Sequence, residues 1–101
     1  MRLSNNASIF EAMRVEKSSR TVFTPLDDGT GVLLNVDTLF YYSLNRTAVT
    51  LWKEIEATNP FTPDDLIPSL CERFEVDQEA AGREIANFVE KLEELKILRA
   101  I

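Results

Sequence analysis

Two pairs of adjacent aspartates have side chains whose type could support proton transfer. Asp27 and Asp28 precede Gly29, whereas Asp64 and Asp65 begin a predicted helix. General acid–base catalysis by two carboxylates needs both groups in one pocket. An Asp-Asp-Gly sequence is instead typical of a turn, and acids in a first helical turn are favoured by the helix dipole. We therefore predict no catalytic residue, and we expect the chain not to be an enzyme.

Metal and nucleophile chemistry is restricted by the residue inventory. The chain has no histidine and one cysteine, Cys71, so it cannot build a histidine-containing or multi-thiolate zinc site or a Ser–His pair. The sequence Gly29-Thr30-Gly31 is too short for a phosphate loop, and a strand follows it where such a loop would open a helix. We predict no metal and no cofactor. A single cysteine also gives no disulfide framework, which favours a reducing cytoplasmic location.

Length and charge further restrict the classes of protein to which this chain can belong. At 101 residues, 45% hydrophobic and 28% charged, the chain fits one small globular domain. There are 11 Lys and Arg against 17 Asp and Glu, so the net charge is −6. Nucleic-acid affinity rests on neutralising phosphates, so this charge argues against it. No signal peptide and no apolar run of membrane-spanning length is visible. We expect a soluble protein without a nucleic-acid or membrane partner.

Three β-rich runs precede any helical pattern. Residues 21–24 and 31–36 flank a turn signal at 27–29, and residues 39–44 form a third run rich in aromatic side chains. They predict a three-stranded antiparallel meander. Residues 1–15 are polar at their start and are interpreted as a flexible N-terminal arm, which leaves residues 16–101 as the domain.

Three helices are predicted after the strands. The first spans residues 46–57 with Asn45 as N-cap, and the second begins at Thr62 and Pro63. Pro68 lies inside the second pattern and predicts a kink or a late start. Asp77 caps the third helix, whose apolar stripe persists to about Lys96. This order predicts an α+β fold, a winged helix-turn-helix-like arrangement in which the three-stranded antiparallel sheet comes first and three helices follow.

The third run, residues 39–44, is the most informative segment for function. In a meander this strand is an edge with unpaired backbone groups, and the run contains no charge and no proline that would block pairing. If it alternates strictly, Phe40 and Tyr42 share one face while Leu39 and Tyr41 share the other. One interpretation is an edge that accepts an extended peptide as an added strand. The alternatives are that these side chains are covered by the arm or half exposed, or that the edge makes a homodimer.

The sequences Gly31-Val32-Leu33-Leu34-Asn35 and Tyr41-Tyr42-Ser43-Leu44-Asn45, followed by Ala48 and Trp52 and two acid-capped helices, resemble the PqqD family. Members of this family are stand-alone recognition elements for the precursors of ribosomally made, post-translationally modified peptides (RiPPs). The similarity covers about residues 18–98. The junction of Leu44 and Asn45 with Trp52 is its best local signature.

The resemblance implies a non-catalytic chaperone that binds the leader segment of a precursor peptide as an added strand. The chaperone would present it to a modifying enzyme, often a radical S-adenosylmethionine (radical SAM) enzyme. Pyrroloquinoline quinone (PQQ) biosynthesis is one system that the resemblance implies, and another peptide-modification cluster is the alternative. Carried over by position, the peptide-binding residues are on the strand edge Leu39, Phe40, Tyr41 and Tyr42, and on the third helix Arg83, Ala86, Asn87, Glu90 and Lys91.

Two other functions fit the same element order. A winged-helix transcription regulator would use the second and third helices on DNA, but residues 62–96 hold four cations and ten anions. A structural subunit that dimerises through the open edge is the other alternative.

Overall fold

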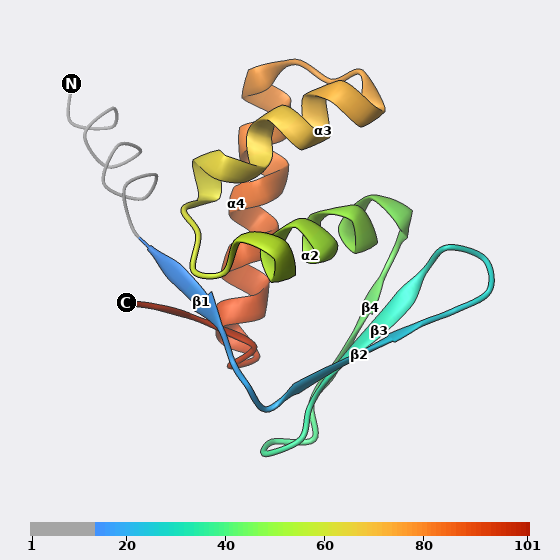
Figure 1. The fold of residues 1–101 in the computed structure, drawn as a ribbon, viewed down its shortest axis with the longest axis vertical. Coiled ribbons are helices and arrows are strands. Elements are labelled where there is room, and N and C mark those ends of the chain that lie inside the picture. The colour runs from blue at the N-terminus through green and yellow to red at the C-terminus, as the bar shows by residue number, and fades with distance from the viewer. Residues whose placement is uncertain (1–13) are drawn as a thin grey trace.

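The computed structural model describes residues 14–101. Strands β2 (Thr21–Pro25), β3 (Gly31–Asn35) and β4 (Tyr41–Leu44) form a three-stranded antiparallel sheet in the order β2-β3-β4. Helices α2 (Arg46–Thr58), α3 (Ile67–Phe74) and α4 (Gln78–Glu94) follow. In Figure 1 the helices are stacked together on one side of the molecule and the sheet extends away from them. The predicted α+β fold, with the sheet first and three helices after it, is confirmed.

A second, smaller sheet joins the two ends of the described chain. Strand β1 (Val15–Lys17) pairs antiparallel with β5 (Leu98–Ala100), and Val15 also bridges Phe61. The two strands lie side by side in Figure 1. Sequence analysis identified neither strand, because three residues are too few for a periodic pattern. Residues 1–13 of the predicted arm lie outside the described residues, whereas Val15 is 1% exposed and belongs to the folded domain.

Each predicted cap is found at its helix. The side chain of Asn45 accepts a hydrogen bond from the Ala48 amide at 2.8 Å, and that of Asp77 accepts one from the Ala80 amide at 2.8 Å. A 3-10 turn, η1 (Pro63–Leu66), precedes α3, which places Pro68 in the first turn of that helix. The late start predicted from Pro68 is therefore confirmed, because proline is tolerated where its missing N–H has no partner anyway.

The core lies mainly among the three helices and the β1–β5 strands, and the three-stranded sheet contributes Leu33 and Leu44 to it. Trp52 and Ile55 from α2, Leu70 from α3, and Ile85 and Leu92 from α4 are each no more than 2% exposed. Phe74, at the end of α3, is 36% exposed, and Ile101 is 59% exposed. Both follow the last residue of their element that faces the core.

Glycine 31 is required by a close approach within the sheet. A Cβ atom there would lie 2.6 Å from the Phe23 ring and 3.1 Å from the Thr24 carbonyl oxygen. Gly31→Ala is expected to lower the free energy of unfolding by about 1–3 kcal/mol, because the ring must shift. Gly82→Ala is the matched control: nothing lies within 4 Å of its Cβ in α4, so the unfolding free energy should rise by about 0.5–1 kcal/mol. Chemical denaturation of both variants measures the difference, and equal effects of the two would contradict this account.

Candidate functional site

The outer edge of β4 carries unpaired backbone groups. The Asn35 amide donates to the Phe40 carbonyl at 2.9 Å, which sets the alternation of hydrogen-bonded pairs along β3 and β4. Leu33 with Tyr42, and Gly31 with Leu44, are the inward-bonded pairs that follow from it. The N–H and C=O groups of Tyr41 and Ser43 therefore point away from the sheet. Within residues 14–101 no segment pairs with this edge.

The other edge of the sheet, on β2, is less suited to accept a strand. By the same alternation, the Val36 amide bonds the Arg20 carbonyl at 2.9 Å, so the backbone groups of Phe23 and Pro25 face outward. Pro25 has no N–H to donate, and proline at an exposed edge is a common device against unwanted pairing. Strand β4 has no such residue. The sheet thus has one protected edge and one open edge.

An open hollow of about 350 Å³ lies beside β4, between that strand and helices α2 and α4. Its apolar part comes from Tyr42, Ala48, Leu51 and Phe88, and its polar part from Asn45, Thr47, Glu84, Asn87 and Lys91. We call this hollow and the adjoining β4 edge the groove.

The apolar part of the groove is fixed by the packing behind it. The Tyr42 and Phe88 rings are tilted by 49° with centroids 6.5 Å apart, a favourable aromatic geometry. Leu51 and Phe88 are buried against the core, while Ala48 and Tyr42 are half-buried. Because Asn45 ends β4 and caps α2 within one residue, the angle between strand and helix is set locally. The small side chain of Ala48 leaves the space between them open.

The rim of the groove carries charges of both signs. Glu84 and Lys91 lie seven residues apart on α4, which is about 10 Å along the helix axis. Lys91 also pairs with Glu94 at 3.6 Å, and both side chains are more than half exposed. An exposed pair of this kind contributes little and is readily exchanged for another partner. These rim charges can therefore orient a bound peptide without requiring that the peptide carry a particular net charge.

This geometry suits an extended backbone better than a small molecule. A strand that bonds antiparallel to Tyr41 and Ser43 would place one residue opposite Tyr42, with its side chain on the same face as the Tyr42 ring. That face is the one that borders the apolar hollow. The next residues along the guest would point to the outer face of the sheet, beside Tyr41, which is 67% exposed.

The predicted strand edge is shorter in the structure than in the sequence analysis. Strand β4 begins at Tyr41, and Leu39 has a φ of +65°, so the expected strand over residues 39–44 is wrong at its first two residues. The Leu39 amide bonds the Asn35 carbonyl at 2.7 Å, which closes a turn there. Strict alternation cannot hold through a left-handed residue. Leu39 and Phe40 are exposed, at 73% and 53%, at one end of the open edge.

The residues assigned to α4 divide into two faces. Asn87 and Lys91 line the groove. Arg83, Ala86 and Glu90 do not line the groove. They lie roughly 90–150° around the helix axis from the mean direction of the α4 residues that do. Arg83 is instead paired with Glu79 at 3.6 Å. The assignment of these five positions to a peptide-binding wall stays a prediction; two of them line the groove and three do not.

Six groove residues were absent from the sequence assignment: Asn45, Thr47, Ala48, Leu51, Glu84 and Phe88. On α4, Glu84 lies three residues from Asn87 and seven from Lys91, so helical spacing places these three residues on one side of the helix. That grouping was the available signal. No sequence signal indicated the contribution of α2, because a sequence does not show how closely two helices approach each other.

Within residues 14–101 there is no group of three or more metal-ligating side chains, and none of the helices described there is both long and apolar enough to span a bilayer.

The carboxylate of Asp28 accepts hydrogen bonds from the hydroxyl and the amide of Thr30, which lower its pKa. Asp28 therefore closes the turn between β2 and β3, the role predicted for it.

A family model, coenzyme PQQ synthesis protein D (PqqD), matches residues 30–98. The chain belongs to the PqqD family. The matched range includes β3, β4 and all three helices, and hence every element of the groove. No curated protein matches this PqqD-family chain.

Two solved structures share its fold. One is TbiB1 in complex with the TbiA(beta) leader peptide: it is 23% identical, with a TM-score of 0.74, and the alignment covers 83% of this chain and 94% of that one. The other is a lasso peptide synthetase B1 complexed with the leader peptide: it is 26% identical, with a TM-score of 0.71, covering 84% and 96%. The PqqD-family fold derived above is therefore also the fold of two chains solved with leader peptides.

Proposed function

We propose that this protein binds the leader segment of a ribosomally made precursor peptide in the groove and presents it to a modifying enzyme. The observation that carries the proposal is a β4 edge with which no segment of residues 14–101 pairs, beside a partly apolar hollow, in a member of the PqqD family. Strand addition supplies affinity through main-chain hydrogen bonds, and the hollow supplies selectivity through one side chain. Two structural relatives were solved with leader peptides, which supports the same role here.

The proposed role is not catalytic. The groove presents backbone donors, apolar side chains and a mixed-charge rim, and its acid Glu84 and base Lys91 lie about 10 Å apart along α4, too far to act on one proton. The chemistry would belong to the partner enzyme, for which a radical SAM enzyme is our first candidate. We place the protein in the cytoplasm, where precursor peptides are made.

The test is a nuclear magnetic resonance (NMR) titration of the ¹⁵N-labelled full chain with the leader of the precursor encoded beside its gene. We expect shifts of the Tyr41 and Ser43 amides and of Asn87 and Lys91 in α4, with the β2 edge around Phe23 unchanged. A scrambled leader of the same composition is the control. Binding that shifts β2 and leaves β4 unchanged would contradict the proposal, and so would unchanged spectra at millimolar peptide.

A further inference from the structure

The β1–β5 sheet carries a local charge opposite to that of the rest of the protein. Residues 14–20 and 96–101 contain five cations and one acid, a local charge of +4, whereas the remaining described residues contain five cations and fifteen acids. These two segments are joined by the β1–β5 pairing and by a hydrogen bond from the Ser18 amide to the Ile97 carbonyl at 2.8 Å. Half of the described cations thus lie on these two joined segments.

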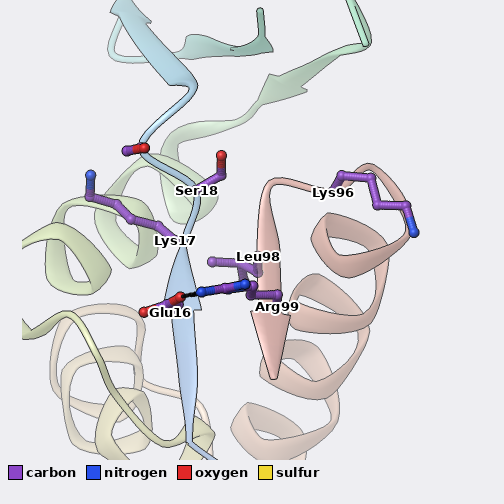
Figure 2. A pocket seen from close by; sticks show the side chains of 7 residues that line it. Glu16, Lys17, Ser18, Lys96, Leu98 and Arg99 are labelled. Carbon is purple, nitrogen blue, oxygen red and sulfur yellow. Dashed lines mark hydrogen bonds and ion pairs between the residues drawn. The ribbon is translucent and has the colours of Figure 1, made fainter. Parts of the chain in front are cut away.

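A hollow of about 410 Å³ lies on these two segments. Its polar lining consists of Glu16, Lys17, Ser18, Ser19, Lys96 and Arg99, over the buried Leu98. In Figure 2 the Glu16 and Arg99 side chains meet across the two strands, and Lys17 and Lys96 extend to either side of them. We call this feature the basic hollow.

The cations of the basic hollow are only partly neutralised within the described residues. Arg99 pairs with Glu16, and nearby Arg20 pairs with Asp37 at 3.0 Å. Lys17 and Lys96 have no ion-pair partner among residues 14–101. Two ammonium groups, the Arg99 guanidinium and two serine hydroxyls therefore offer donors to an incoming acceptor.

We propose that the basic hollow binds an acidic segment of a partner protein through its carboxylates. Carboxylates match the donors present, and complementary charge steers such an encounter. A nucleic acid fits less well, because its backbone would extend past this small surface over a molecule with a net charge of −10 elsewhere. Glu16 already occupies Arg99 as an internal carboxylate, so an incoming acid would share or displace it.

The basic hollow is separate from the groove. The two have no lining residue in common, and five of the seven residues that line the hollow lie outside the range matched by the PqqD model. The hollow is therefore a property of this chain in addition to the family's matched region. A partner bound in the basic hollow would leave the β4 edge free. The proposal therefore does not depend on leader binding, and either proposal can fail while the other holds.

The experiment uses the ¹⁵N-labelled full chain and an acetylated hexaglutamate peptide at low salt, with hexaglutamine as the neutral control. We expect hexaglutamate to shift the amides of residues 16–20 and 96–100 and to leave Tyr41 and Ser43 unchanged. Binding should weaken as salt is added. The proposal would be overturned by no shifts at millimolar peptide, by shifts spread over the whole surface, or by shifts at residues 16–20 with inorganic phosphate or oligodeoxythymidylate that exceed those with hexaglutamate.

Matched variants distinguish binding at the basic hollow from a general electrostatic attraction between the protein and the peptide. Lys17→Gln with Lys96→Gln should weaken hexaglutamate binding about five- to tenfold, whereas Lys53→Gln with Arg73→Gln, an equal charge change on α2 and α3, should alter it less than twofold. Glu16→Gln should strengthen binding about threefold, because it frees Arg99, and Glu72→Gln on α3 should not. Equal effects of the paired variants, or weaker binding after Glu16→Gln, would reject the site.

Discussion

Ser43→Pro is expected to lower the affinity for the leader peptide at least about 30-fold while the fold is retained. The Ser43 N–H points out of the open β4 edge, so proline removes no hydrogen bond within the sheet. It does remove a donor to the guest strand, and its ring occupies the space where the guest backbone would lie. A guest carbonyl left without a partner costs about 1–3 kcal/mol, which accounts for an effect of this size.

Ser43→Thr is the matched control, because it keeps the N–H and favours extended backbone. Isothermal titration calorimetry with the leader peptide gives both affinities, and thermal unfolding shows whether each variant is folded. We expect the threonine variant to bind within about threefold of the wild type. Wild-type affinity in a folded Ser43→Pro variant would show that the peptide does not add to this edge.

The sequence was sufficient for the elements that repeat a period over many residues. The apolar stripe of α4 and the caps at Asn45 and Asp77 are local properties, and each was located from the sequence to within about two residues. The order of three strands before three helices then left few ways to cover one sheet face. The open edge on β4 could be predicted for the same reason, since a meander has two edges by construction.

The rest depends on contacts between residues distant in sequence. The pairing of Glu16 with Arg99 joins positions 83 residues apart, and strands of three residues are too short to show a periodic pattern that would predict it. The left-handed Leu39 is equally hidden, because leucine has no preference for positive φ and takes it only where the surrounding turn demands it. Which residues of α2 line the groove could not be predicted, because this depends on how closely α2 approaches α4, for which the sequence carries no signal.

One buried polar residue links the sheet to the end of α4. Asn35 is 3% exposed, and its side-chain amide donates to the carbonyls of Leu95 and Lys96 at 3.2 and 3.1 Å. Its side-chain oxygen accepts from the amides of Asp37 and Thr38 at 2.9 and 3.3 Å, in the turn that leads to β4. This side chain therefore ties the turn before β4 to the C-terminal end of α4, in addition to the Tyr42–Phe88 contact between β4 and α4.

Asn35→Ala is expected to lower the free energy of unfolding by about 3 kcal/mol. Each hydrogen bond contributes about 1 kcal/mol, and the buried carbonyls left without donors add a desolvation cost. Against a total of about 5–15 kcal/mol for a domain, this is a large loss. Asn35→Asp, which keeps the shape but places an oxygen opposite the two carbonyls of α4, should be at least as destabilised at neutral pH. Chemical denaturation measures both values.

Asn87→Ala is the matched control, since Asn87 is exposed on α4 and alanine is the better helix former. Its stability should equal or slightly exceed that of the wild type. Because Asn35 ties the turn before β4 to the end of α4, Asn35→Ala should also weaken leader binding at temperatures where the variant is still folded. A folded Asn35→Ala variant of wild-type stability would mean that these four hydrogen bonds are replaced by water without loss, and that the groove is held open by apolar packing alone.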